Sequence, residues 1–188
     1  MRKSILCLGL AALLTTGTAW GQASREEDRK LARQERKALQ DSLDMAYFRE
    51  AKQAIDNREF VLEADKVVFK YGQMAYVTSN TNFVALKGDK AVVQVAFNIP
   101  VSGPNGLGGV TVQGTASDIK ATTDKKGNVS LSMSVMGTGI SAQVNISMPY
   151  GTNEADVDIL PNFNSNHLTL SGRLLPMEKA NVFQGTTL

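Results

Sequence analysis

The sequence predicts a mainly β protein: an antiparallel meander of about eight strands that closes into a barrel or folds over into a sandwich, preceded by one N-terminal helix. Apolar and polar residues alternate with a period of two from Phe60 onward, which is typical of antiparallel strands with one buried face. Turn residues separate these runs, and no helical pattern lies between them. A long meander removes its open edges by closing or by folding over.

Residues 1–23 have the pattern of a secretory signal peptide. Arg2 and Lys3 precede a short apolar run at 5–14, and Gly21 and Ala23 provide small residues before a cleavage point at Ser24. The apolar run is too short for the roughly 20 residues that cross a bilayer. We therefore expect a periplasmic or secreted mature chain that begins near Ser24 and has no membrane span.

The composition of the mature chain excludes several classes of function. Cys7 is the single cysteine and lies in the apolar run, so the mature chain has no disulfide, thiolate metal site or cysteine nucleophile. The formal net charge is +2, and the loss of Arg2 and Lys3 leaves a neutral protein. Because nucleic-acid binding needs a basic surface, neutrality argues against a nucleic-acid partner.

Residues 24–57 predict a charged amphipathic helix. They contain no Pro or Gly and equal numbers of acidic and basic side chains. Apolar residues recur at spacings of three and four in the second half, with Met45 and Phe48 beside this stripe. The stripe consists of Leu39, Leu43, Tyr47, Ala51, Ala54 and Ile55. We expect 38–55 to pack on the domain and the earlier part to be a solvated extension or, alternatively, a partner-binding arm.

Residues 58–188 predict a single antiparallel β domain. Hairpin turns are expected at 87–90, 125–128, 137–139 and 149–153. Four glycines, at 103, 106, 108 and 109, belong to a strand connection and not to a phosphate loop, because neither a lysine nor a helix follows them. Gly114 lies inside the next strand and predicts a bulge, a bend or a close backbone approach.

The residues that could carry chemistry are few. His167 is the single histidine and, by alternation, faces solvent. Glu154, Asp156 and Asp158 share one strand face, where they form a paired acid/base site, part of a calcium site or an ordinary charged outer face. A polar loop nearby, with Asn162, Asn164, Ser165 and Asn166, could add oxygen ligands. Alternation favours the outer face, so we predict no catalytic, cofactor-binding or metal-binding residue.

The order of the segments resembles domain-of-unknown-function family 4251, a set of secreted proteins from Bacteroidetes. The resemblance covers about residues 36–176. Four pieces carry it: Glu-Phe-x-x-Glu-Ala-Asp at 59–65, Asn-Phe-x-x-x-x-Gly-Asp at 82–89, the central glycines, and Ser-Gly-x-Leu at 171–174. The resemblance implies a β-rich fold and an extracytoplasmic compartment, and it implies no site residue.

These observations leave three functions open. The first is a non-enzymatic periplasmic domain, a lipocalin-like barrel whose aliphatic interior is either filled or holds one apolar ligand. The second is a structural envelope protein that docks a partner through its charged helix. The third is an enzyme that uses Glu154, Asp156 and Asp158, which ranks last because these residues are expected on the wet face.

Overall fold

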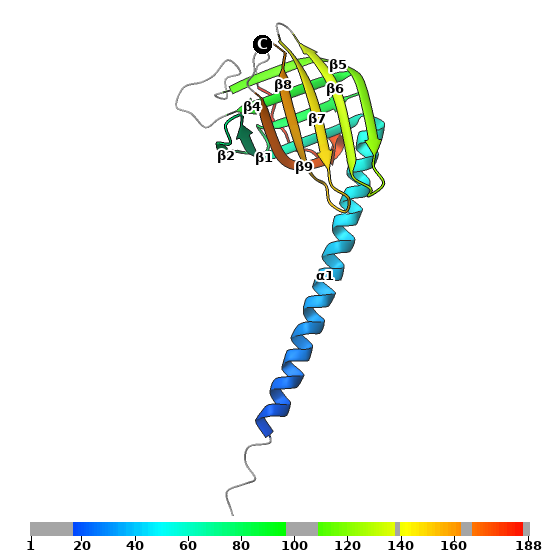
Figure 1. Ribbon diagram of the computed structural model, residues 1–188, viewed down its shortest axis with the longest axis vertical. Coiled ribbons are helices and arrows are strands. Elements are labelled where there is room, and N and C mark those ends of the chain that lie inside the picture. Colours follow the sequence, from blue (N-terminus) through cyan, green and yellow to red (C-terminus); the bar gives the residue numbers. More distant parts are fainter. Residues whose placement is uncertain (1–16, 97–108, 138–139, 163–166, 186–188) are drawn as a thin grey trace, which may run out of the picture. The chain divides into compact units, whose positions relative to one another are not determined.

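The computed structural model describes residues 17–96, 109–137, 140–162 and 167–185 (Figure 1). The chain divides into two compact units, residues 1–42 and 43–188. The helix α1, Gly17–Asn57, belongs to both. It is the expected N-terminal helix, and it begins inside the segment predicted as the signal peptide.

The described part of the first unit is helical. Its side chains from 25 to 42 are all exposed, which agrees with a solvated helix. No helix in the described part of the chain combines the length and the hydropathy needed to cross a membrane.

The second unit is an antiparallel barrel, so the prediction of about eight strands is confirmed and the barrel is the form they take. The strands β1 and β3 to β9 follow one another around the barrel, and β1 pairs with β9 to close it. The short strand β2 is an extra strand paired with the second half of β1. The bounds are β1 Glu59–Phe69, β2 Met74–Tyr76, β3 Phe83–Lys87, β4 Lys90–Ala96, β5 Gly109–Thr123, β6 Val129–Gly137, β7 Ile140–Met148, β8 Glu154–Pro161 and β9 Leu168–Pro176.

The last part of α1 packs against the barrel at the end where β1 begins. Phe48, Ala51, Ala54 and Ile55 are buried in the main core with the inward-facing strand residues. The ring of Phe48 meets that of Tyr150, in the β7–β8 turn, edge to face at 5.1 Å. This end of the barrel is therefore filled by helix side chains.

The predicted apolar stripe of α1 is only partly correct. Leu39, Leu43 and Tyr47 are exposed, whereas Phe48, which lies beside the stripe, is buried. Phe48 makes the contact with Tyr150, so the buried face of the helix is rotated toward Phe48 relative to the one expected from spacing.

The expectation of a uniformly wet outer face is wrong at β1, β3 and β4. Val61, Phe83 and Ala85 point outward and are nevertheless buried. They are covered by the C-terminal segment 177–185, which begins with the short 3-10 helix η1, Met177–Lys179. A second, smaller apolar cluster thus lies outside the barrel.

Two glycines mark places where neighbouring strands approach too closely for a side chain. A Cβ on Gly114 would collide with the carbonyl oxygen of Met136 in β6, which confirms the predicted close backbone approach. The bulge on β5 lies a few residues further on, where the pairing register with β6 shifts between Ser117 and Lys120. A Cβ on Gly172 would collide with the carbonyl oxygen of Glu63 across the β1–β9 closure.

Candidate ligand-binding site

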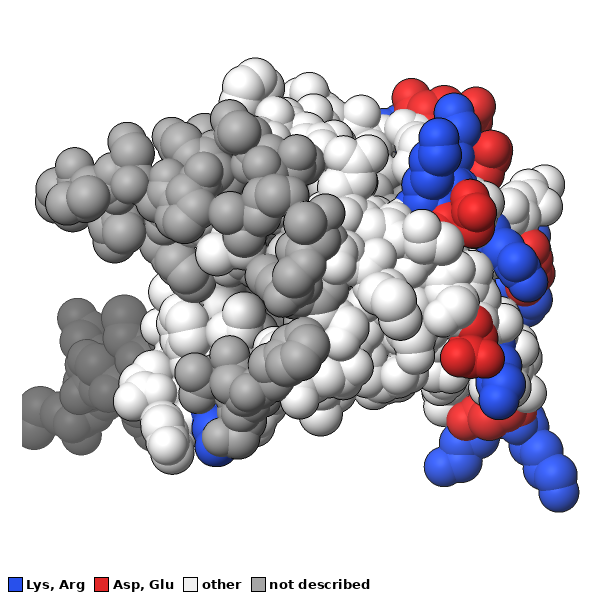
Figure 2. Space-filling model, turned by 90° about the horizontal axis from the view of Figure 1, so that it is seen from above, with Lys and Arg blue, Asp and Glu red and all other residues white. Residues whose placement is uncertain are grey.

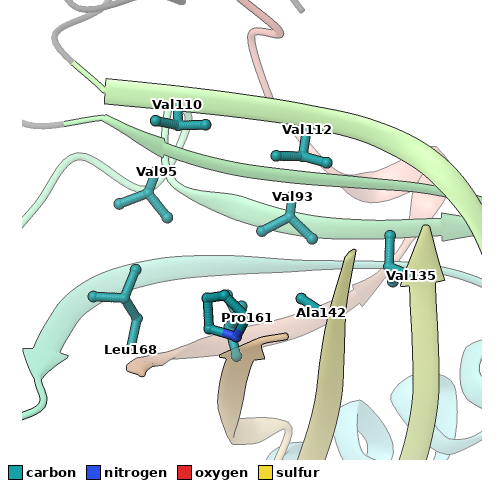
Figure 3. A pocket seen from close by; sticks show the side chains of 9 residues that line it. Val93, Val95, Val110, Val112, Val135, Ala142, Pro161 and Leu168 are labelled. Carbon is teal, nitrogen blue, oxygen red and sulfur yellow. The ribbon is translucent and has the colours of Figure 1, made fainter. Parts of the chain in front are cut away.

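The barrel contains an apolar cavity of about 190 Å³ at the end opposite to the helix. Six strands supply its wall, because alternate residues of each strand point inward. The wall consists of Val93, Val95, Val110, Val112, Val135, Ala142, Ile159, Pro161 and Leu168. Figure 3 shows the valines of β4 and β5 facing the space that Pro161 and Leu168 border from the other side.

The register of the sheet holds the wall together. Val95 pairs with Val110 and Val93 with Val112 between β4 and β5. On the other side Ile159 pairs with Leu168, between β8 and β9. The wall residues therefore form cross-strand pairs at neighbouring levels near one end of the barrel, so the cavity depends on the strand register.

The described lining of the cavity is apolar throughout. All nine wall side chains are aliphatic or proline. An apolar cavity of about 150 Å³ accommodates benzene, so this one has room for roughly seven or eight carbon atoms. A polar ligand group would lose its hydrogen bonds to water here without replacement, at a cost of roughly 2–7 kcal/mol.

The cavity reaches solvent beside Val110. This residue is 39% exposed, although it points into the barrel, whereas Ile159 is 5% exposed. Ala96, Gly109 and Asn162, which lie next to the wall at the strand ends, carry no charge, while His167 and Lys70 lie at the same ends of β9 and β1. In Figure 2 most of the charged side chains gather along one side, and a basic side chain also lies on the other side, beside the grey atoms.

The three carboxylates singled out from the sequence do not form a site. Glu154, Asp156 and Asp158 lie on the outer face of β8 and are exposed, as alternation predicts. Asp158 accepts a hydrogen bond of 2.6 Å from the hydroxyl of Thr169 on β9. Within the described ranges, no group of three or more His, Cys, Asp or Glu side chains is placed to hold a metal ion.

The other residues singled out from the sequence are not among the described wall residues of the cavity. His167 is exposed, as expected, and directly precedes β9. Gly103, Gly106 and Gly108 lie in 97–108, outside the described residues, as do Asn164, Ser165 and Asn166. The assignment of Gly109 to the connection is wrong, because Gly109 is the first residue of β5 and pairs with Ala96 of β4. Asn162 is exposed, and its side chain bonds to the Ser141 hydroxyl at 2.8 Å.

A buried polar node, which sequence reasoning missed, anchors the C-terminal segment outside the barrel. Gln94 on β4 is fully buried, and its Nε2 donates to the carbonyl oxygens of Thr81 and Phe183. Its Oε1 accepts hydrogen bonds from the Thr111 hydroxyl and the Gly185 amide, both at 2.8 Å. The one sequence signal for this node is Gln94 itself, an amide side chain within the otherwise mostly aliphatic strand β4.

A larger, polar hollow of about 320 Å³ lies between the end of α1, the start of β1 and η1. Two of its four charges form an ion pair, since Lys179 Nζ lies 2.8 Å from Glu50 Oε2, and Glu59 and Glu178 also line the hollow. This hydrogen bond raises the pKa of Lys179 above its ordinary value. The hollow therefore contains a satisfied, exposed ion pair, and we assign the candidate site to the apolar cavity.

Comparison with known proteins identifies the family. The family model described as Domain of unknown function (DUF4251) matches residues 42–174. The chain belongs to the DUF4251 family. A crystal structure of a DUF4251 family protein from Bacteroides eggerthii is 52% identical, covers 76% of this chain and 96% of that chain, and has a TM-score of 0.67. None of the curated proteins matches.

The range of the DUF4251 match shows which parts of the chain belong to the family domain. It begins at Ser42, the last residue of the first unit, and it includes every wall residue of the cavity. It ends at Leu174, before the C-terminal segment that covers Val61 and Phe83. The cavity thus lies within the DUF4251 domain, while the covering segment follows it.

Proposed function

We propose that this DUF4251 domain binds a small apolar molecule in the barrel cavity, and that it acts by binding and not by catalysis. The single observation that carries the proposal is a cavity of about 190 Å³ whose nine wall side chains are all aliphatic or proline. The signal-peptide pattern at 1–23 supports a place for this activity in the periplasm or outside the cell.

The energetic cost of the cavity supports the same proposal. Enclosed unfilled apolar volume lowers stability by about 24 cal/mol per Å³, so 190 Å³ corresponds to at most roughly 5 kcal/mol, and to less where the cavity is open to solvent. That is a large fraction of the 5–15 kcal/mol by which domains are usually stable. A hydrocarbon group that fills the cavity restores the lost contacts, and binding then stabilises the fold.

The proposal is tested with a small alcohol as the ligand and with a substitution that fills the cavity with a wall side chain. We expect 1-hexanol to shift the methyl NMR resonances of Val95 and Ile159, which line the cavity, and to leave Leu174 unchanged. Ala142→Phe places a ring in the cavity and is expected to abolish these shifts. It is also expected to remove any hydrocarbon that mass spectrometry finds in an organic extract of the purified wild-type protein.

The matched control is Ser141→Phe, which adds the same bulk to the neighbouring residue. Ser141 is not among the wall residues, and its main-chain oxygen accepts from the Asn162 amide. This variant should keep hexanol binding. If hexanol leaves the Val95 and Ile159 methyls unmoved in the wild type, or if both variants bind equally, the proposed function is wrong.

A second candidate function, partner docking by the charged helix, is favoured by the complete exposure of residues 25–42. Leu31 and Leu39 are exposed by 58% and 62% within this segment, so the arm buries no large side chain of its own. Deletion of 24–37 should abolish capture of an envelope partner and leave the melting temperature almost unchanged. A deletion that unfolds the barrel would contradict this candidate.

A further inference from the structure

The cavity stops at a layer of fully buried side chains in the middle of the barrel. On β6 to β9, the next inward-facing residue beyond each wall residue lies two positions further from the mouth. These floor residues are Met133, Val144, Val157 and Leu170, each 0% exposed.

The floor has the same construction as the wall. Val135 and Ala142 are a wall pair between β6 and β7, and Met133 and Val144 are the floor pair below them. Between β8 and β9, Val157 and Leu170 are likewise the floor pair below Ile159 and Leu168. Between β7 and β8 the floor residue Val144 pairs with the wall residue Ile159, so the floor is staggered across these two strands. The cavity is therefore closed at its inner end by a staggered layer of buried side chains.

We propose that the cavity receives the end of one saturated hydrocarbon chain and that the floor limits the inserted length to about seven or eight carbons; this inference rests on the proposed function. None of the wall residues that the structure describes is aromatic, so among them a flat aromatic ligand finds no ring to pair with. An aliphatic wall gives an alkyl chain close contacts on all sides.

The polar end of such a molecule stays outside. The described wall residues offer it no hydrogen-bonding side chain, and Val110, where the cavity reaches solvent, is 39% exposed. Among the described residues at this end, Ala96, Gly109 and Asn162 are uncharged, whereas His167 directly precedes Leu168 and Lys70 follows Phe69, the pairing partner of Leu168. A single-chain amphiphile therefore fits this arrangement, with its alkyl chain inside and its polar head group at the mouth.

A series of unbranched 1-alkanols from butanol to dodecanol tests the inference. Dissociation constants are measured from the methyl NMR shifts of Val95 and Ile159 in the full barrel. Each buried methylene contributes about 0.8 kcal/mol, so the affinity should rise about fourfold per carbon. The rise should stop near eight carbons, because further methylenes remain in water.

The floor variant is Leu170→Ala, which removes the side chain directly below Leu168. It should move the end of the affinity rise to a chain longer by about three carbons, since it vacates the volume of three carbon atoms. Leu174→Ala is the matched control, because Leu174 is also 0% exposed and lies on the same face of β9, further from the mouth. The control should leave the chain-length limit unchanged. Val157→Ala, a smaller truncation of the same floor pair, replaces Leu170→Ala if that variant does not fold.

The outcomes separate the two proposals. If neither an alkanol nor toluene moves the wall methyls, the proposed function fails. If alkanols bind and the affinity rises without a limit to dodecanol, or if the floor variants leave the limit where it was, the cavity binds hydrocarbon and the chain-length inference fails. If toluene binds and alkanols do not, the inference of an alkyl-chain ligand is likewise wrong, and the ligand is an aromatic molecule.

Discussion

The side-chain amide nitrogen of Gln94 donates a hydrogen bond of 2.8 Å to the main-chain oxygen of Phe183, and this bond joins the outside of β4 to the C-terminal segment. Gln94 is fully buried and makes three further hydrogen bonds, with Thr81, Thr111 and Gly185. The C-terminal segment is thus fixed by a polar anchor as well as by its apolar contacts.

Replacing this anchor should destabilise the protein. Gln94→Leu leaves the carbonyl oxygens of Thr81 and Phe183 and the amide of Gly185 without this partner, and each buried unsatisfied group costs about 1–3 kcal/mol. We expect the free energy of unfolding, measured in urea, to fall by about 3 kcal/mol. Gln113→Leu, at an exposed outward position of β5, is the control and should change it little. Equal effects of both changes would contradict the anchor.

Removing the C-terminal segment should uncover the outer apolar cluster. A chain that ends at Pro176 exposes Val61 and Phe83, which are 1% and 2% exposed when covered. We expect a lower melting temperature and increased fluorescence of a hydrophobic dye. Lys179→Met keeps the segment and loses only its exposed ion pair with Glu50, which contributes little at the surface, so dye binding should stay low. Low dye binding by the truncated chain would show that the cluster is covered in another way.

The closure between β1 and β9 should tolerate no side chain at Gly172. An added Cβ would collide with the main-chain oxygen of Glu63, so Gly172→Ala requires the strands to separate. We expect a loss of more than about 3 kcal/mol, at the upper end for single substitutions, measured by urea denaturation. Gly72→Ala is the comparison: its Cβ meets nothing within 4 Å, and its φ of +81° costs about 1–2 kcal/mol. A milder effect at Gly172 than at Gly72 would contradict the close approach.

The turn between β5 and β6 should make stability depend on pH at the acidic end. Hydrogen bonds from the Asn128 side chain, and from the main-chain amides of Asn128 and Lys126, lower the pKa of Asp124 below its ordinary 3.8. A lowered folded-state pKa contributes stability that is present above about pH 4 and is lost as the pH falls through the folded-state value.

This turn is tested with Asp124→Asn. The stability difference between wild type and variant should be constant above about pH 5 and should shrink below about pH 4. Carbon NMR titration of the Asp124 carboxyl gives its pKa directly, and Asn128→Ala should raise it. A difference that grows toward low pH would contradict the assigned sign.

The inward faces of the strands could be predicted from the sequence. Alternation places Val129, Leu131, Met133 and Val135 inside, and all four are buried. The same rule places Glu154, Asp156 and Asp158 outside, where the structure has them. Period-two patterning is a local property, so it predicts which face of a strand is buried without knowledge of the rest of the fold.

Features that depend on distant segments could not be predicted in this way. Val61 and Gln94 point outward and are buried because residues 177–185 cover them, and no local period contains that information. The cavity could not be predicted from local periodicity either. Alternation predicts that Val95 and Ile159 point inward, but the volume between them depends on the number and stagger of the strands.

The pairing of β1 with β9 also determines the order in which the protein can form. Ala64 and Gly172 are neighbours across this pair, although more than one hundred residues separate them in the chain. Hairpins such as β6–β7 need only their own sequence, whereas this last pairing must wait for nearly the whole domain to emerge and incurs the largest loop-closure entropy. A slow final folding step is therefore expected, during which β1 and β9 present unpaired edges that favour association between chains.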